Sequence, residues 1–304
     1  MSRTRRPSPC CGARCRPMPA RCMCKSAWPL PSRQHSRNEE KKPVKIERIQ
    51  LIYFSATGTT RAVGQAVAKG TGLPVEEWDC TPQRAKAPFQ PDGQTLTILA
   101  VPSFGGRAPA PVAERLEQLK GCGQAVLLSV YGARASEDTL AELYDLAKQA
   151  GYQPIAAGEF VARHSMATRI AAERPNGADL SQAAALGKQA LELAENHLPE
   201  QELRLELPGN RPYREFSGVP FHPKASKKCV ECGRCADQCP VGAIPAGTPN
   251  RTDSKVCITC MRCVAVCPVK ARSLGKLPEL AVTAKLRKVC DDHRENRVWL
   301  AGLE

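Results

Sequence analysis

The sequence has no apolar run that approaches the roughly 18 residues needed to cross a bilayer. Its first 30 residues also lack the apolar core of a secretory signal. Aromatic residues are scarce, at 5% of the chain, but hydrophobic residues reach 42% and charged residues 24%. This balance excludes wholesale disorder, and 304 residues are enough for two domains of ordinary size. We therefore expect a cytoplasmic protein without a membrane partner.

Positive charge is concentrated at the N-terminus of a chain whose net charge is +14. Residues 1–44 hold 11 Lys/Arg and 2 Asp/Glu, whereas residues 45–304 hold 33 and 28. The N-terminal segment is rich in Arg, Pro and Cys and has no hydrophobic period, so we expect a disordered tail, interpreted as non-native sequence upstream of a start near Val44. A nucleic-acid-binding arm and a zinc knuckle are alternatives. Only Trp28 interleaves the arginines and no His stands at ligand spacing, so we expect no nucleic-acid partner.

Eight of the 16 Cys fall between Cys229 and Cys267, in two runs of identical spacing. The runs are Cys229-Val-Glu-Cys232-Gly-Arg-Cys235-Ala-Asp-Gln-Cys239-Pro240 and Cys257-Ile-Thr-Cys260-Met-Arg-Cys263-Val-Ala-Val-Cys267-Pro268. Each Cys of the first run recurs in the second at one constant offset, which indicates an internal duplication with pseudo-twofold symmetry. The two halves differ at Gly242 and its counterpart Lys270.

Both runs follow the pattern C-x2-C-x2-C-x3-C-P, in which three thiolates bind one 4Fe-4S cluster and the fourth reaches the other cluster. The predicted ligands are Cys229, Cys232, Cys235 and Cys267 for cluster I, and Cys257, Cys260, Cys263 and Cys239 for cluster II. Paired zinc sites fit less well because structural zinc usually takes two more widely separated C-x2-C pairs. Disulfides would need an oxidising compartment.

Residues 225–275 resemble a two-cluster bacterial-type ferredoxin in all eight Cys and both following Pro. The resemblance implies two hairpins and two short helices around the clusters, a small α+β domain. It also implies low-potential, one-electron transfer.

The N-terminal half alternates β-rich and helical patterns. Strands are predicted at 48–54, 75–79, 96–101, 124–130 and 153–160, and helices at 61–69, 110–120, 136–150 and 180–197. This alternation implies βα units and a doubly wound α/β sheet of five parallel strands.

Three loops at the carboxyl ends of these strands carry candidate ligand-binding residues. They are Ser55, Thr57, Gly58, Thr59 and Thr60 in the first loop, Pro102, Ser103, Phe104, Gly105 and Gly106 in the second, and Tyr131 and Gly132 in the third. Hydroxyls and a Gly at a helix N-terminus suit a phosphate, and an aromatic residue in each of the other two loops suits a flat ring. A loop that merely caps its helix is the alternative. No Walker or G-x-G-x-x-G motif is present, so neither an NTP nor a dinucleotide is the first choice.

The three loops resemble those of the flavodoxin family across residues 46–197, and the resemblance implies that they hold FMN. The whole order resembles bacterial flavodoxin/ferredoxin fusion proteins. It predicts a flavodoxin-like domain at 45–198, a linker at 199–224, the ferredoxin domain at 225–275 and an extension at 276–304. The many Arg and Lys residues of the extension suit a terminal helix or a contact with an acidic partner.

This organisation predicts an electron-transfer protein that passes electrons between two 4Fe-4S clusters and FMN, with redox proteins as its partners. One alternative is an FMN-dependent reductase with its own substrate, in which Tyr131, Arg134, Arg107 or His164 would act. His164 is interpreted first as a hydrogen-bonded structural residue. The other alternative is a flavin-free iron–sulfur adaptor. Cys80, Cys122 and Cys290 lie outside the cluster spacing and are interpreted as core or surface thiols.

Overall fold

The structure is a computed structural model that describes residues 44–85, 90–196 and 203–303. The predicted tail at 1–44 therefore lies, except for Val44, outside the described residues. No helix of the described part of the chain is long and apolar enough to cross a membrane.

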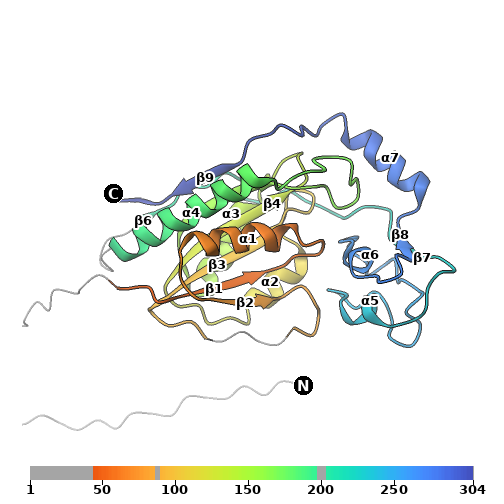
Figure 1. The fold of residues 1–304 in the computed structure, drawn as a ribbon, viewed down its shortest axis with the longest axis horizontal. Helices are drawn as coiled ribbons and strands as arrows, with labels where there is room; N and C mark the ends of the chain where they lie inside the picture. Colours follow the sequence, from red (N-terminus) through yellow and green to blue (C-terminus); the bar gives the residue numbers. More distant parts are fainter. Residues whose placement is uncertain (1–43, 86–89, 197–202, 304) are drawn as a thin grey trace, which may run out of the picture. The chain divides into compact units, whose positions relative to one another are not determined.

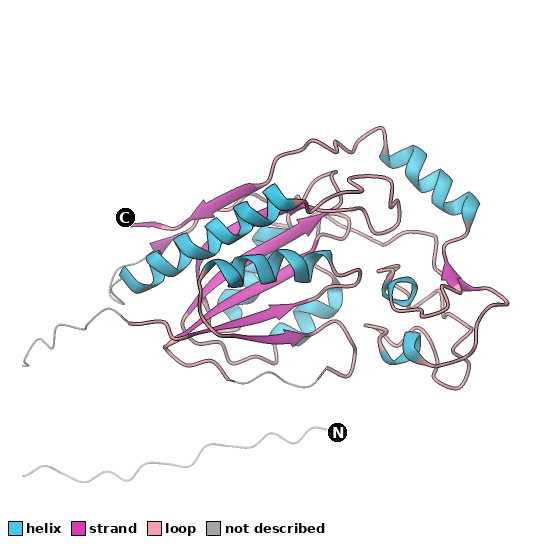
Figure 2. Cartoon of the chain, viewed as in Figure 1, coloured by secondary structure: helices cyan, strands magenta, loops and turns pink. Residues whose placement is uncertain are grey.

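A parallel sheet with helices on both faces forms the N-terminal half (Figure 1; Figure 2). Its strands are β1 (Arg48–Tyr53), β2 (Val75–Asp79), β3 (Thr95–Pro102), β4 (Gln124–Tyr131) and β5 (Gln153–Val161). Its helices are α1 (Thr59–Gly70), α2 (Ala110–Leu116), α3 (Thr139–Gln149) and α4 (Gly177–Asn196). These five strands pair in parallel in the order β2-β1-β3-β4-β5, which is the flavodoxin order. The predicted fold class is confirmed.

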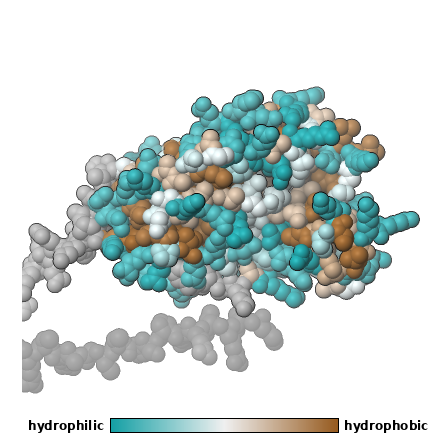
Figure 3. Space-filling view, in the orientation of Figure 1, coloured by the Kyte–Doolittle hydropathy of each residue, from teal (hydrophilic) through white to brown (hydrophobic). Residues whose placement is uncertain are grey.

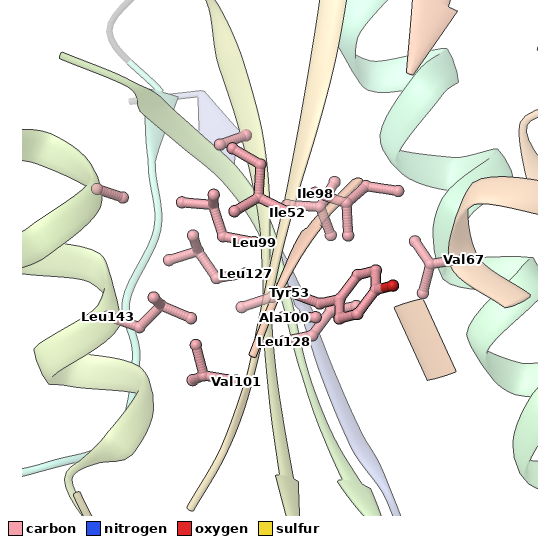
Figure 4. Close-up of a cluster of buried hydrophobic side chains, with 14 of the residues drawn as sticks. Ile52, Tyr53, Val67, Ile98, Leu99, Ala100, Val101, Leu127, Leu128 and Leu143 are labelled. Carbon is pink, nitrogen blue, oxygen red and sulfur yellow. The ribbon is translucent and has the colours of Figure 1, made fainter. Parts of the chain in front are cut away.

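The core lies between the sheet and its two helical layers (Figure 4). Leu99 and Leu127 point toward Leu143 of α3, whereas Ile98 lies on the side of Val67 in α1. Strands β3, β4 and β5 are buried along almost their whole length. Burial on both faces explains why their sequences are nearly continuous apolar runs rather than alternating ones.

The C-terminal extension adds a sixth strand that the sequence analysis did not predict. Strand β9 (Arg297–Leu300) pairs antiparallel with β5 at the edge of the sheet. Arg297 contributes an ion pair of 2.5 Å to Glu159, whose side chain is almost fully buried. The extension also contains α7 (Lys276–Leu286), in keeping with the expected terminal helix, and β10 (Gly302–Leu303), which pairs with β6 (Leu203–Arg204).

The segment with the Cys runs contains little regular structure. It has two short helices, α5 (Arg234–Asp237) and α6 (Arg262–Ala265), and an antiparallel pair of two-residue strands, β7 (Lys224–Ala225) and β8 (Arg272–Ser273). The expected pair of helices is present. Among the described residues of this segment the strand pairing is limited to β7 and β8.

The linker is held against the flavodoxin-like half by two carboxylates of the α3 region. Asp138 accepts hydrogen bonds from the backbone N–H groups of Asn210 and Arg214, at 2.8 and 2.7 Å. Burial of Asp138 opposes ionisation, but these hydrogen bonds outweigh it and the pKa of the carboxyl is lowered. Asp145 forms a bidentate ion pair with Arg211. The part of the linker from Asn210 to Arg214 is therefore a docked strap rather than a free connector.

Candidate cofactor sites

Two small cavities in the C-terminal region are each lined by four Cys. Cavity I is lined by Cys229, Cys232, Cys235 and Cys267, and cavity II by Cys239, Cys257, Cys260 and Cys263. Each set takes three Cys from one run and the fourth from the other run. The structure thus brings together both predicted ligand sets, although ligation itself stays a prediction. Four thiol groups around one cavity fit a 4Fe-4S cluster, whose iron prefers thiolate ligands.

The duplication extends from the sequence into the backbone. Three pairs of equivalent positions in the two runs have left-handed φ angles: Glu231 and Thr259 (51° and 52°), Gly233 and Met261 (77° and 67°), and Gly242 and Lys270 (66° and 49°). Four of these six residues are not Gly, so the fold holds side chains in a conformation that they rarely adopt. The left-handed turns shape both Cys loops in the same way.

One backbone N–H group points at a sulfur atom of these cavities. The N–H of Ala271 donates to Sγ of Cys267 at 3.2 Å. Burial raises the pKa of Cys260 and of Cys263 to about 12. A bound metal would replace these protons, so metal binding at these cavities would release protons.

The two cavities differ in exposure. In cavity II, three of the four Cys are buried and Cys257 is partly exposed. In cavity I only Cys235 is buried, and Cys232 is exposed. Cavity I therefore lies closer to solvent.

A third cavity, the sheet-edge cavity, lies at the carboxyl ends of the parallel strands. Eight of the predicted FMN-binding residues line it: Thr57, Thr59, Thr60, Pro102, Ser103, Phe104, Tyr131 and Gly132. These residues come from all three predicted loops. Hydroxyls at the N-terminus of the 12-residue helix α1 could hold a phosphate, and Phe104 and Tyr131 could contact a flat ring.

The other four predicted residues do not line this cavity. Ser55 is buried, and its Oγ accepts a hydrogen bond from the N–H of Arg61 in the first turn of α1, which is the capping role that the alternative interpretation assigned to this loop. Gly58 is the N-cap residue of α1, with a φ of 94°. Gly105 and Gly106 also have positive φ. An added Cβ on Gly105 would collide with Phe216 of the linker, and one on Gly106 with Arg214 of the linker and with Glu137, which precedes α3.

The loop after β5 completes the wall with Ala162, Arg163, His164 and Ser165. Sequence reasoning did not list this loop as a cofactor contact, although it too follows the carboxyl end of a parallel strand. Nδ1 of His164 accepts hydrogen bonds from the N–H groups of Met166 and Ala167, both at 3.2 Å. Burial, with the nearby positive charge of Arg134, lowers the pKa of His164 to about 4. His164 is therefore neutral near pH 7, with its hydrogen on Nε2.

Neither Arg107 nor Arg134 lines the sheet-edge cavity. Arg107 forms a bidentate ion pair with Glu142, with distances of 2.8 and 2.7 Å. Arg134 forms another with Glu137, with distances of 2.8 and 2.5 Å. Arg107 thus holds its loop against α3, and Arg134 stabilises its own loop.

The remaining Cys differ in their surroundings. Cys80 is buried and donates to the carbonyl of Tyr53 at 3.2 Å, Cys122 is exposed, and Cys290 packs against a small cluster of buried side chains that includes Tyr131.

Cavity II adjoins the sheet-edge cavity through one residue. Cys260 lines both of them and belongs to the same hydrophobic core as the sheet. The predicted cluster ligand and the predicted flavin contacts therefore share a wall.

Two arginines link the cavity II region to the parallel sheet. Arg262 donates to the carbonyl of Ser55 at 3.0 Å and to Asp79 at 3.2 Å. Arg115, which is buried in α2, donates to the carbonyls of Thr81 and Pro240, at 3.1 and 2.7 Å. These contacts hold the chain around cavity II against the sheet.

Residues 224–292 match a family model described as a 4Fe-4S dicluster domain. A search of curated protein sequences found no relative. Similar solved structures include a flavodoxin from the domain Archaea, with 14% identity over 49% of this chain and 99% of that chain and a TM-score of 0.35.

Two other similar structures are oxidoreductases by name. Rubredoxin oxygen:oxidoreductase from Desulfovibrio gigas is 16% identical over 51% of this chain and 37% of that chain, with a TM-score of 0.37. A flavone reductase is 14% identical over 49% of this chain and 63% of that chain, with a TM-score of 0.34. The strand order β2-β1-β3-β4-β5 defines the fold independently of these structures.

A match to an iron–sulfur domain model and a flavodoxin-like fold in one chain support electron transfer or flavoprotein oxidoreductase chemistry in general. The chain joins a flavodoxin-like α/β fold to a segment that matches a 4Fe-4S dicluster domain model, an organisation consistent with the flavodoxin/ferredoxin fusion proteins.

Proposed function

We propose that this protein is an electron carrier that passes electrons between two 4Fe-4S clusters and FMN. The observation that carries the proposal is the position of Cys260, which lines both the sheet-edge cavity and cavity II. A cluster held by Cys260 would adjoin a flavin held by the three loops. FMN exchanges one or two electrons and each cluster exchanges one, so the chain could pair single electrons.

The residues assigned to FMN have separate tasks. Thr57, Thr59 and Thr60 would donate hydroxyl hydrogen bonds to the phosphate at the N-terminus of α1, where unpaired backbone N–H groups also favour an anion. Phe104 and Tyr131 would contact the ring. Gly132 leaves room for the imidazole of His164, because a Cβ at this position would lie 2.5 Å from the ring.

The order of the cofactors follows from exposure. Cavity I is the more exposed of the two Cys sites, whereas cavity II shares a wall with the sheet-edge cavity. We therefore infer that electrons enter or leave through cluster I and reach FMN through cluster II. Joining the cofactors in one chain replaces an encounter between two proteins with electron transfer inside one protein.

The contacts of the candidate catalytic residues do not favour a reductase with its own substrate. Arg107 and Arg134 are engaged by carboxylates and do not line the sheet-edge cavity. His164 and Tyr131 line it, but His164 is neutral near pH 7 and burial raises the pKa of Tyr131, so both are weak acids there. A proton donor for a substrate would have to be free to change its partner during the reaction. Redox proteins therefore remain the proposed partners.

The test is cofactor analysis of the full chain purified without oxygen. About one FMN and about eight iron per chain, four for each cluster, are expected. Cys260→Ala should lose about half of the iron, whereas the matched control Cys290→Ala should keep all of it. About eight iron without FMN, even after FMN is added, would overturn the flavin assignment and favour a flavin-free adaptor. About four iron would overturn the two-cluster assignment.

A further inference from the structure

We propose that the surface around cavity I is a docking site for an acidic one-electron carrier protein. This inference rests on the proposed function, because it assumes that electrons pass through cluster I. It names the chemistry of the partner, which the proposed function leaves open. We call this surface the cavity I face and define it by Val230, Cys232, Arg234, Pro268 and Val269, all of which line the cavity.

The centre of the cavity I face is apolar and exposed. Val230 is 63% exposed and Val269 is 40% exposed, and Cys232 and Pro268 are also exposed. Single exposed valines are common on protein surfaces, but these side chains border one cavity. Figure 3 shows brown, hydrophobic residues gathered over the part of the molecule that carries α5 and α6, bordered by teal, hydrophilic ones. A cluster in this cavity would thus lie behind an apolar contact area.

Basic residues flank the residues of the cavity I face in the sequence. The segments 224–235 and 267–273 contain five exposed basic residues: Lys224, Lys227, Lys228, Arg234 and Lys270. Pairing of β7 with β8 brings these two segments together. The same segments contain one acidic residue, Glu231, which also lines cavity I and whose carboxylate accepts a hydrogen bond of 2.7 Å from Asn250.

These basic side chains are available to a partner. None of the five forms an ion pair with another residue that the structure describes. A surface with this excess of positive charge attracts a negatively charged protein and repels a basic one.

The internal repeat shows what one of these positions can bind. Arg234 and Arg262 occupy equivalent positions of the two runs, at the start of α5 and of α6. Arg262 binds the carboxylate of Asp79 and the carbonyl of Ser55 in the flavodoxin-like half. Arg234 is exposed and lines cavity I. We infer that Arg234 makes the corresponding contact with a carboxylate of the partner. A contact between an arginine and a carboxylate would then hold a protein surface beside each cluster.

The experiment uses a 2Fe-2S ferredoxin rich in Asp and Glu as the probe, because its visible absorption differs from that of 4Fe-4S clusters. The probe is reduced, mixed with the full chain under anaerobic conditions, and the second-order rate of cluster reduction is followed by stopped-flow absorption. Lys227→Gln, Lys228→Gln and Arg234→Gln are combined in one variant. The matched control combines Lys69→Gln, Lys148→Gln and Lys188→Gln, three exposed residues of α1, α3 and α4, and so removes the same charge.

We expect the cavity I variant to react about tenfold more slowly than the unmodified chain at low salt, and the control to change less than about twofold. The difference should shrink at high salt because mobile ions screen the charges. Equal slowing in both variants, or no slowing in the cavity I variant, would overturn the proposal. So would an equal rate with a probe ferredoxin whose carboxylates have been amidated.

A separate readout distinguishes failure of the docking site from failure of the proposed function. Iron and FMN contents of each variant show whether the cofactors are in place, independently of the probe. If the variants contain both clusters and FMN, but the rate with the probe does not depend on the charge of the cavity I face, only the docking site is contradicted. A chain that binds no FMN contradicts the proposed function, whatever the rate with the probe.

Discussion

The guanidinium of Arg262 donates a hydrogen bond of 3.0 Å to the backbone carbonyl of Ser55, 207 positions earlier in the chain. Arg262 precedes Cys263 of cavity II, and Ser55 begins the loop that leads into α1. The same guanidinium reaches Asp79 at 3.2 Å and Gln238 at 2.6 Å, and the side chain of Arg262 is only 17% exposed. Arg262 therefore ties the proposed cluster II to the proposed phosphate loop.

Replacing Arg262 should loosen this connection. Arg262→Gln leaves the carbonyl of Ser55 and the carboxylate of Asp79 without a charged donor, which costs about 1–3 kcal/mol for partly buried groups. We expect transfer between the clusters and the flavin to slow several-fold with unchanged iron and FMN contents. Rapid reduction of the clusters followed by the absorption change of the flavin measures this rate.

The repeat provides the control for this experiment. Arg234→Gln alters the equivalent position of the first run, where the side chain is exposed, and should change stability by no more than about 0.5 kcal/mol. Its internal transfer rate should equal that of the unmodified chain. Equal internal rates in both variants would mean that Arg262 does not position the two halves.

The pair Gly242 and Lys270 should respond in opposite directions to substitution. Both have left-handed φ angles, 66° and 49°, but only Lys270 has a side chain that this conformation disfavours. Gly242→Ala is expected to lower stability by about 1 kcal/mol, and Lys270→Gly to raise it by up to about 1 kcal/mol. The temperature at which the visible absorption of the clusters disappears on anaerobic heating measures both changes. A loss of thermal stability in Lys270→Gly would show that the lysine side chain makes a contact worth more than its backbone strain.

The five parallel strands could be predicted because each leaves a local signal. Strands buried on both faces, such as β3 and β4, are short apolar runs, and the helices between them have their own period. Strand β9 leaves no such signal, because its four residues form an edge strand with little burial. Its place depends on pairing with β5, which lies far earlier in the chain, and no local pattern reveals that pairing.

The candidate sites likewise include features that could be predicted from the sequence and features that could not. The crossed Cys sets follow from spacing, since the pattern C-x2-C-x2-C-x3-C-P carries its geometry in the sequence. Gly105 and Gly106 show the opposite case. A Gly required for a positive φ looks the same in a sequence as a Gly required for close approach of a ligand, and these two pack against the linker. The contact of Arg262 with Ser55 likewise had no sequence signal beyond its duplicated position.

His164 should make the protein less stable in mild acid. Its pKa is lowered to about 4 in the folded state, against about 6.5 when unfolded, so the unfolded chain binds the proton more tightly between these values. The stabilisation is complete above pH 6.5 and is lost as the pH falls toward 4. Between pH 7.5 and pH 5 the loss from this one group is about 2 kcal/mol. Urea unfolding of the full chain across this range measures it.

Replacing His164 by Asn separates the effect of protonation on stability from the effect of losing the hydrogen bonds. In His164→Asn, the amide oxygen can accept the hydrogen bonds that Nδ1 of His164 receives from Met166 and Ala167, but it does not titrate in this range. The difference in unfolding free energy between the two proteins should therefore shrink as the pH falls from 7.5 to 5. A constant difference would contradict the lowered pKa.

We expect Cys239 to bind the same cluster as Cys257, and not the cluster of Cys229, because the predicted ligand sets cross between the two runs. Cys239 stands in the first run but lines cavity II with Cys257, and Cys267 stands in the second run but lines cavity I with Cys229. Each of these four Cys, changed singly to Ala, should lose about four of about eight iron.

The cluster that survives then reveals the pairing. The electron paramagnetic resonance spectrum of reduced Cys239→Ala should match that of Cys257→Ala, and the spectrum of Cys267→Ala should match that of Cys229→Ala. A match between Cys239→Ala and Cys229→Ala would mean that each run binds its own cluster. Cys239→Ala and Cys257→Ala keep only cluster I and should also lose electron exchange between cluster and flavin. The reason is that Cys260, which also lines the sheet-edge cavity, belongs to the ligand set of cluster II. Loss of this exchange in Cys267→Ala but not in Cys239→Ala would instead place cluster I beside the flavin and reverse the proposed order.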